Sequence, residues 1–448
     1  MSRLFGTDGI RGRANAYPMD GQTAFRAGKA AAAYFRKTGK AGHIVIGRDT
    51  RISGDMLVQA VAAGICSAGL NVRHLGVIPT PAVANAAVHT GAGGGVVISA
   101  SHNPFDDNGI KLFDSNGRKL SDQAEDQIEA LMQAPESETH SAEAEKIGQI
   151  IDGAPARDSY VRFLLDNSSC KSLEELTLVL DCANGATYQA APDLFQRLGA
   201  RVTPLYCRPN GININDQCGS QHPEIMAKEV VRKKADIGLA FDGDGDRLIA
   251  VDEKGRVLSG DQIMAICAND MRKKGLLRNN LVVSTVMSNL GFGKSLRSLG
   301  IDVVATQVGD RYVMQEMVER DAVLGGEDSG HMIFRDRHTT GDGLFAALRL
   351  IEAMQSAGKK LSELSEIMTV YPQELINVTV SDKPPLDTIP QIVAVIEAVE
   401  SKLADQGRVL VRYSGTQLKC RVMVEGPTIA ETKAYAQQIA DVVRSELS

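Results

Sequence analysis

Several residue types are scarce in this sequence, and each shortage narrows the possible functions. Among 448 residues there is no tryptophan, and aromatic residues make up only 4%, which argues against aromatic platforms that stack on sugars or bases. Basic residues number 49 and acidic residues 55, so the chain has a net charge of −6 and lacks the basic surplus of a nucleic-acid binder. With 43% hydrophobic residues the composition is globular, and we expect no nucleic-acid partner.

Cysteine pairs and uninterrupted apolar runs are missing as well. Seven cysteines without any Cys-x-x-Cys pair predict free thiols in a reducing, cytoplasmic compartment. The first residues form no apolar run, so we expect no signal peptide. Residues 74–105 contain no acidic residue, lysine or arginine, but prolines, glycines and polar residues interrupt them. We therefore expect a buried core segment there and no membrane partner.

A pattern of strand, helix and strand occurs three times along the chain. The first strand of each repeat is expected at 43–47, 176–180 or 281–285. Each following helix ends at a glycine (Gly69, Gly199 or Gly300), which fits the left-handed cap of such a turn. The alternation predicts parallel, doubly wound sheets, and the repetition predicts three related α/β domains.

The chain after residue 371 follows another pattern. A strand, a helix, two strands and a last helix are expected there, with Thr428 and Glu431 as a capping box for the last helix. This order predicts a smaller α+β domain. A polar, acidic stretch at 133–146 leads out of the first domain, and Tyr371-Pro372 marks the last boundary. The predicted domains are 1–155, 156–256, 257–370 and 371–448.

The first motif that could carry chemistry is Ser101-His102-Asn103-Pro104, after the apolar run 95–98. It stands at the carboxyl end of a strand, where α/β sheets bind ligands, and Pro104 holds Asn103 extended. Adjacent serine and histidine rarely form a hydrolase dyad, and no Gly-x-Ser-x-Gly elbow is present here. These residues alone favour an ordinary turn. Lys111 could return beside Ser101 as a proton-transfer group, although a solvated lysine is the default.

The second motif, Asp242-Gly243-Asp244-Gly245-Asp246-Arg247, follows the strand-like run 237–241. Three carboxylates at alternate positions can converge on a hard cation, and without one they repel each other. A calcium hand competes, because Glu253 falls at its twelfth position, but Arg247 stands where that loop needs glycine. The residues after Arg247 are typical of a strand, so we expect Mg²⁺ on Asp242, Asp244 and Asp246 with a position left for a phosphate oxygen. A solvated acidic turn is the other alternative.

Two later motifs are weaker when taken singly. Gly325-Gly326-Glu327-Asp328-Ser329-Gly330-His331 combines glycines with hydroxyl-binding and titratable groups, although such loops are usually only turns. Arg412-Tyr413-Ser414-Gly415-Thr416, with Arg421 on the next strand, suits a phosphate, or is an ordinary hairpin with exposed basic residues. The loops 5–12, which contains Arg11, and 47–51 add glycine and arginine.

In this order the motifs resemble those of the α-D-phosphohexomutase family, over nearly the whole chain. The resemblance rests on Ser-His-Asn-Pro at 101–104, Asp-Gly-Asp-Gly-Asp-Arg at 242–247, Gly-Glu-Asp-Ser-Gly-His at 326–331 and Arg-Tyr-Ser-Gly-Thr at 412–416. It implies three similar α/β domains and a smaller fourth around a central cleft, in agreement with the repeats. The opening Arg-Leu-Phe-Gly-Thr-Asp-Gly-Ile-Arg-Gly looks most like members that act on a hexosamine phosphate.

The resemblance also implies roles for single residues. Ser101 would carry a phosphoryl group, and Asp242, Asp244 and Asp246 would hold Mg²⁺ together with that phosphate. Lys111 and His331 would transfer protons, and Arg247 would neutralise charge. The implied substrate-binding residues are Arg11, Gly309, Glu327 and Ser329, and, for the distal phosphate, Arg412, Ser414, Gly415, Thr416 and Arg421. After Ser-Gly-Thr the family usually continues Glu-Pro, whereas this chain has Gln417-Leu418.

The implied enzyme is an isomerase that interconverts hexosamine 6-phosphate and 1-phosphate. Its cofactors would be Mg²⁺ and a hexosamine 1,6-bisphosphate, which serves as activator and intermediate. Glucosamine is the favoured sugar, with mannose and glucose phosphates as alternatives, and its product would feed a bacterial route to UDP-N-acetylglucosamine and cell-wall precursors. A Mg²⁺-dependent sugar phosphatase and a non-catalytic binding protein on the same fold stay open. The sequence does not indicate an oligomeric state.

Overall fold

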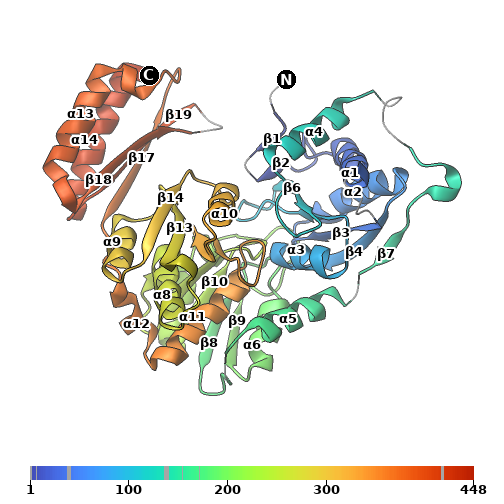
Figure 1. Ribbon diagram of the computed structural model, residues 1–448, viewed down its shortest axis with the longest axis horizontal. Helices are drawn as coiled ribbons and strands as arrows, with labels where there is room; N and C mark the ends of the chain where they lie inside the picture. Colours follow the sequence, from blue (N-terminus) through green and yellow to red (C-terminus); the bar gives the residue numbers. More distant parts are fainter. Residues whose placement is uncertain are drawn as a thin grey trace. The chain divides into compact units, whose positions relative to one another are not determined.

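The computed structural model describes residues 3–6, 8–37, 42–135, 141–153, 155–170, 172–414 and 418–448 (Figure 1). The chain forms two compact units. The first unit comprises Met1–Val286 and Val303–Glu366, and the second comprises Met287–Asp302 and Ile367–Ser448. The four domain boundaries expected from the sequence stay predictions.

The first sheet of the first unit has seven strands in the order β1-β2-β6-β5-β3-β4-β7. Its strands are β1 (Phe5–Gly6), β2 (Gly9–Arg13), β3 (His43–Arg48), β4 (Asn71–Val77), β5 (Gly94–Ile98), β6 (Asp107–Asp114) and β7 (Ile150–Asp152). β3, β4, β5 and β7 are parallel, as expected, but β6 runs antiparallel to β5 and β2. The short connection 99–106 explains the difference, because a parallel crossover needs a dozen or more residues.

Helices cover both faces of this sheet. α1 (Gly21–Lys37) and α2 (Gly54–Ser67) lie side by side on one face, where Ile44 and Ile46 of β3 join their core (Figure 1). α3 (Thr80–His89) packs on the other face, where the Val83 side chain takes the space left by Gly47. Alternate side chains of one strand thus serve opposite layers, as the period of a strand requires. α4 (Asp122–Gln133) packs beside α1.

The close packing of α1 on α2 depends on glycine, which gives a stability prediction. A Cβ atom at Gly28 of α1 would overlap the backbone carbonyl of Val61 in α2. We expect Gly28→Ala to lower the free energy of unfolding by about 2 kcal/mol, because overpacking forces the two backbones apart. Chemical denaturation measures the effect. Gly21→Ala in the same helix is the control, since nothing lies within 4 Å of its Cβ position; an equal loss there would contradict the explanation.

Two further sheets complete the first unit. The second sheet has the order β12-β11-β10-β8-β9, with β8 (Thr177–Asp181), β9 (Arg201–Leu205), β10 (Ile237–Phe241), β11 (Leu248–Asp252) and β12 (Val257–Leu258). The third has the order β14-β13-β15-β16, with β13 (Leu281–Thr285), β14 (Asp302–Thr306), β15 (Leu324–Gly326) and β16 (Met332–Phe334). Their helices are α5 (Ala156–Asn167), α6 (Ala190–Arg197), α7 (Glu224–Lys233), α8 (Gly260–Lys273), α10 (Asp310–Glu319), α11 (Gly343–Ala357) and α12 (Leu361–Leu364).

The expected repeat is present, and each copy contains one more shared feature than the sequence pattern indicated. Gly69, Gly199 and Gly300 all have left-handed φ angles, of 86°, 92° and 67°, as predicted for the helix ends. In each sheet a strand is also followed by an antiparallel neighbour: β5 by β6, β10 by β11 and β15 by β16. The three connections are 99–106, 242–247 and 327–331. Three of the four sequence motifs therefore occupy the same place in the repeat.

The second unit is the expected α+β module together with α9 (Leu290–Ser298). Its sheet has the order β17-β19-β18, with β17 (Gln373–Thr379), β18 (Arg408–Tyr413) and β19 (Lys419–Glu425), and it packs against α13 (Pro390–Leu403) and α14 (Ile429–Leu447). The Thr428 side chain accepts a hydrogen bond from the Glu431 backbone N–H, which confirms Thr428 as the N-cap of α14. The Glu431 carboxylate accepts from the Thr428 hydroxyl, and the reciprocal bond of a capping box, from the Thr428 N–H, is not among the described contacts.

Two expectations drawn from absences can also be compared with the fold. Residues 74–105 run through β4, α3 and β5, and the side chains of Val83 and Val97 are buried, as predicted. No helix in the described ranges is long and apolar enough to cross a bilayer. All seven cysteines are free thiols, as expected, while the cytoplasmic location stays a prediction.

Candidate active site

The Ser101 hydroxyl lies at the carboxyl end of β5 and points at the acidic loop of the second sheet. Its Oγ donates a hydrogen bond to Asp242 Oδ2 at 2.5 Å, and the residue is only 1% exposed. Ser101 has a left-handed φ of 52°, a strained conformation for a residue with a side chain, and such strain is typical of functional sites. His102 Nδ1 lies 3.4 Å from the same Oγ, and burial, followed by the charge of Arg247, lowers the pKa of His102 to about 4.

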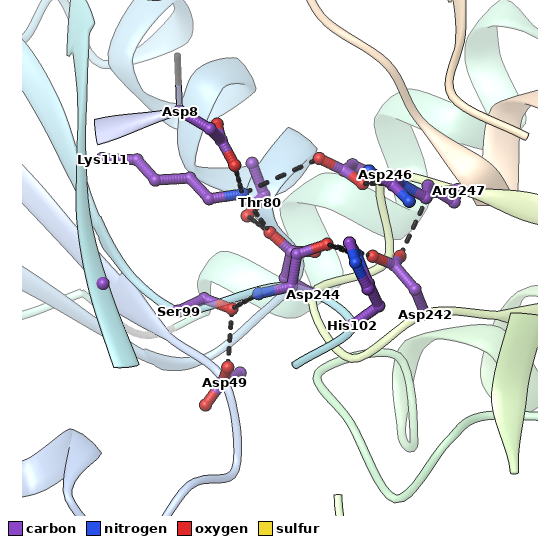
Figure 2. A network of polar contacts seen from close by, with 12 residues as sticks. Asp8, Asp49, Thr80, Ser99, His102, Lys111, Asp242, Asp244, Asp246 and Arg247 are labelled. Atoms are coloured by element: carbon purple, nitrogen blue, oxygen red, sulfur yellow. Dashed lines mark hydrogen bonds and ion pairs between the residues drawn. The ribbon is translucent and has the colours of Figure 1, made fainter. Parts of the chain in front are cut away.

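A buried arginine holds this loop in place. Arg51 pairs with Asp49 at 2.9 Å and donates hydrogen bonds to the backbone oxygens of Ser101 and Asn103, at 3.0 and 2.8 Å. Ser99 joins the same group, because its Oγ donates to Asp49 Oδ2 and accepts from the Ser101 N–H (Figure 2). The loop 47–51 therefore fixes the serine backbone, a role that its sequence did not reveal.

The three aspartates of the second motif converge as predicted. Asp242, Asp244 and Asp246 are all buried in the connection between β10 and β11, and each offers one carboxylate oxygen within 4.8 Å of the others. Gly245 has a φ of 76°, which allows the tight turn between them. The calcium-hand alternative fails, because the strand β11 follows the loop and Glu253 instead accepts hydrogen bonds from Ser362.

The electrostatics of this cluster fit a divalent cation. Burial, reinforced by Asp246 and Asp244, raises the pKa of Asp242 well above its usual range. Burial would also raise the pKa of Asp244, but the charge of Lys111 lowers it below its usual value. One oxygen each of Asp244 and Asp246, Oδ1 in both cases, is buried and has no hydrogen-bond partner among the described residues. Unsatisfied carboxylate oxygens are hard ligands of the kind that Mg²⁺ prefers, so the residues present fit that ion.

Lys111 reaches the aspartates from β6. Its Nζ donates to Asp244 Oδ2 at 2.8 Å and lies 3.0 Å from Asp8 Oδ2, and Figure 2 shows it between these residues and Asp246. Thr80, the first residue of α3, donates to the same Asp244 oxygen at 2.6 Å. Burial alone would lower the pKa of Lys111, but these carboxylates raise it well above its usual value. Lys111 therefore lies at the acidic loop, and no hydrogen bond joins it to Ser101 among the described contacts.

Arg247 and His331 join the second sheet to the loop between β15 and β16. The two residues form a backbone bridge, and the Arg247 N–H donates to Asp242 Oδ1 at 3.1 Å. Gly330 has a φ of 93°, and a Cβ there would overlap the Leu248 carbonyl, so glycine is required. His331 Nδ1 lies 3.5 Å from Asp246; burial would lower the pKa of His331, but the carboxylate of Asp246 raises it to about 9.

The remaining candidates of the first unit also gather near this loop. Glu327 Oε1 accepts a hydrogen bond from the Gly309 N–H at 3.0 Å, and the Ser329 hydroxyl lies 3.4 Å from Glu327 Oε2. Burial alone would lower the pKa of Arg247, but the negative charges of Asp242, Asp246 and Glu327 raise it. Arg11 forms an ion pair with Asp8, next to Lys111. The structure thus brings together a serine, three aspartates, three basic side chains (Arg11, Lys111 and Arg247), a histidine and a carboxylate–hydroxyl pair.

The second unit contains the residues that were predicted to bind the distal phosphate of the substrate. Arg412 and Arg421 are opposite each other on β18 and β19, and burial together with the charge of Arg421 lowers the pKa of Arg412. Among the described residues Arg421 Nε is buried without a hydrogen-bond partner, and a bound anion is one way to satisfy such a group. Ser414 follows β18 and its N–H donates to the Lys419 carbonyl. Gly415, Thr416 and Gln417 lie outside the described residues.

Four polar residues at the site were missed from the sequence. Asp8, Thr80, Lys119 and Asp310 contact the candidates above or each other. Asp8 carried a signal as part of the glycine and arginine loop 5–12, and Asp310 directly follows Gly309, which the resemblance had singled out. Thr80 and Lys119 come from unremarkable sequence, and their place at the site became visible only in the folded chain.

Such a site suits phosphoryl transfer, because fixed positions and neutralised charge, more than covalent chemistry, accelerate that reaction. The class defined by the fold and the site is therefore that of α/β phosphoryl-transfer enzymes.

Family comparisons narrow this class, and the chain belongs to the phosphoglucomutase/phosphomannomutase family, the α-D-phosphohexomutases. Models of its α/β/α domains I, II and III match residues 2–139, 158–255 and 259–371, and that of its C-terminal domain matches 375–442. The chain is thus an isomerase, an intramolecular phosphotransferase, with three α/β domains and a C-terminal domain, as the resemblance implied. Enzymes of this family generally depend on Mg²⁺.

Individual relatives cover the whole chain. The phosphoglucosamine mutase of Syntrophus aciditrophicus is 54% identical over 448 residues, and that of Syntrophobacter fumaroxidans is 52% identical over 450, with full coverage of both chains. Among solved structures, a family protein of Burkholderia thailandensis has a TM-score of 0.82 at 23% identity, covering 99% of this chain and 97% of its own. The Aspergillus fumigatus N-acetylphosphoglucosamine mutase, in complex with GlcNAc-6P and magnesium, has a TM-score of 0.70 at 18% identity and coverages of 99% and 96%.

Proposed function

We propose that the protein is a phosphoglucosamine mutase, which interconverts glucosamine 6-phosphate and glucosamine 1-phosphate. The contact of the Ser101 hydroxyl with the buried aspartate cluster carries the proposal of phosphoryl transfer. The choice of sugar is supported by full-length relatives of that name at about half identity. Phosphomannomutase and phosphoglucomutase activities are not favoured by these relatives.

The reaction consists of two phosphoryl transfers through one serine. In the first, the bond between phosphorus and Ser101 Oγ breaks, a bond to the sugar O1 forms, the O1 proton leaves to a base, and Oγ takes up a proton. The product is glucosamine 1,6-bisphosphate. In the second, the bond between phosphorus and O6 breaks and the bond to Oγ re-forms; Oγ gives up its proton to a base, O6 takes up a proton, and glucosamine 1-phosphate leaves. The enzyme regains its phosphoryl group, and no net water or nucleotide is consumed.

Residues of the first unit position the reacting groups. Arg51 holds the backbone of the Ser101 loop, so that the phosphoryl acceptor stays fixed between the two transfers. Arg247 and Lys111 supply positive charge beside the serine and the aspartates. Lys111 and His331 are the residues that we assign to proton transfer.

The sugar and the metal have separate ligands in this proposal. Glu327 and Ser329 bind sugar hydroxyls beside Gly309, and Arg11 contributes to substrate binding. Asp242, Asp244 and Asp246 would hold Mg²⁺, which when bound neutralises charge on the phosphoryl group being transferred. In the second unit, Arg412, Ser414 and Arg421, with Gly415 and Thr416, grip the phosphate that does not react.

An assay of purified protein with glucosamine 6-phosphate, Mg²⁺ and a trace of glucosamine 1,6-bisphosphate tests the proposal. We expect glucosamine 1-phosphate to form without release of inorganic phosphate, at a kcat/KM at least about tenfold above those for mannose 6-phosphate and glucose 6-phosphate, because one substituent distinguishes the sugars. Inorganic phosphate as the main product would indicate a phosphatase instead. Equal turnover of all three sugars would contradict the choice of substrate.

A further inference from the structure

Lys119 is a buried cation that the reaction described above does not use. It stands in the turn after β6, where a backbone bridge to Phe113 fixes it, and its side chain is only 11% exposed. Its Nζ pairs with two carboxylates, Asp8 and Asp310, the latter at 2.5 Å. These carboxylates come from β1–β2 and α10, which are far apart in the sequence. Lys119 therefore joins two segments of the first unit by charge.

Each of the two carboxylates leads to a residue proposed for proton transfer. Asp8 Oδ2 lies 3.0 Å from Lys111 Nζ, and Asp310 Oδ2 lies 3.4 Å from His331 Nε2. Lys111 and His331 in turn contact the aspartate cluster, at Asp244 and Asp246. The charges alternate along both paths, so each group is held by a partner of opposite sign. Among these contacts, Lys119 is the residue that pairs with both Asp8 and Asp310 and so links the path to Lys111 with the path to His331.

The consequence of removing Lys119 follows from this arrangement. Asp8 would keep Lys111 and Arg11 as ion-pair partners, and Asp310 would keep His331 alone among the described residues. The largely buried carboxylates of Asp8 and Asp310 would then move closer to the positively charged groups that take part in the reaction, because a charge with little access to water is stabilised by the nearest opposite charge. Displacements of this kind change the reacting geometry directly, and they reach the substrate-binding residues only one contact further on, through Arg11, because Glu327 and Ser329 do not contact Lys119 in the described contacts.

We propose that Lys119 is a positioning residue, which holds Lys111 and His331 in register with the aspartate cluster through Asp8 and Asp310. The inference rests on the proposed function, because it assumes that Lys111 and His331 act in turnover. Partners that orient the residues of a metal site have a comparable role, and their loss typically lowers metal affinity or activity by about 10- to 100-fold.

A set of substitutions at Lys119 tests the proposal. We expect Lys119→Met to lower kcat by about 10- to 100-fold with KM changed less than about twofold. Lys119→Arg should recover most of the loss, because a guanidinium can pair with both carboxylates. Steady-state kinetics on the phosphosugar that the wild type turns over gives both constants.

Arg311 provides a matched control. Arg311 follows Asp310 in the sequence and joins α10 to α4 by ion pairs with Asp122 and, at 2.8 Å, with Glu125. In the described contacts it touches neither Asp8 nor the proton-transfer residues. We expect Arg311→Met to lower the melting temperature as much as Lys119→Met does, while kcat stays within about twofold of wild type. An equal loss of kcat in both variants would mean that Lys119 only stabilises the fold.

The cavity beside Lys119 allows a second, independent test. Lys119, Asp310 and Thr340 are among the residues that line a cavity of about 540 Å³. In Lys119→Ala, added ethylammonium or propylammonium ions can enter it and place a charge between the two carboxylates. We expect either amine to raise kcat of this variant at least about fivefold, whereas propanol, which has a similar size but no charge, should not.

The outcomes separate this proposal from the proposed function. No mutase turnover by the wild type on any sugar phosphate would refute the function. Wild-type kcat in Lys119→Met, or no rescue of Lys119→Ala by either amine while kcat is reduced, would refute the positioning role alone.

Discussion

Ser101→Ala is expected to abolish mutase turnover, with kcat lowered by at least about 10⁴-fold, because the alanine leaves no atom to accept the phosphoryl group. The purified variant should also lack the added mass of one phosphoryl group that we expect on Ser101 of the wild type. Coupled assays of turnover and intact-mass spectrometry with peptide mapping measure the two effects. The fold should be little changed, since the Ser101 backbone stays tied to Arg51 and Ser99.

Ser99→Ala is the control for this prediction. Ser99 lies two residues away, is equally buried, and its hydroxyl bonds only to Asp49 and the Ser101 N–H in the described contacts. Its removal should loosen the loop and lower kcat by about tenfold, yet leave the phosphoryl group on Ser101. Mutase turnover that persists in Ser101→Ala, or a phosphoryl group mapped to another residue, would rule out the phosphoserine mechanism.

Asp246→Asn should have the second largest effect, on the dependence of the enzyme on Mg²⁺. Asp246 Oδ1 is buried and has no hydrogen-bond partner in the described part of the chain, so it can bind an ion, and an amide in its place is a weaker, uncharged ligand. We expect the Mg²⁺ concentration for half-maximal activity to rise about 10- to 100-fold and kcat to fall by at least about 100-fold. Activity titrations and the Mg²⁺-induced rise in melting temperature give both quantities.

Asp252→Asn separates this effect from a loss of stability. Asp252 ends β11, is fully buried and pairs with Arg256, but it lies outside the aspartate cluster. The substitution should lower the melting temperature while the Mg²⁺ titration keeps its wild-type midpoint. If Asp246→Asn responded to Mg²⁺ like the wild type, the aspartates would not be the metal site.

Much of the site was predictable because its residues stand together in short motifs. The spacing of Asp242, Asp244 and Asp246 by single glycines already indicated a converging carboxylate cluster, and the structure brings their oxygens together. The turn after a buried strand likewise indicated where Ser101 would be presented. What the motifs could not show is their shared position in the repeat, between a core strand and an antiparallel neighbour.

The partners between the motifs were not predictable, because they come from distant parts of the chain. Arg51 stood out only as part of a glycine and arginine loop, and the structure shows that it binds the backbone of residues 101–104. For Lys111 the sequence left open a solvated side chain or a place beside Ser101, and the structure shows a buried side chain paired with Asp244 and Asp8. A lone lysine such as Lys119 carries no signal at all, since most lysines are solvated.

The sequence by itself indicated the class of fold and singled out the serine and the aspartates as candidate site residues. Local features were enough for this, because strand ends, glycine turns and adjacent carboxylates act within a few residues. Only the tertiary structure decided which charges neutralise each other. Pairing depends on the positions of whole sheets, and burial there makes each unpaired charge costly, so the contacts of Lys111, Lys119 and His331 became visible only in the folded chain.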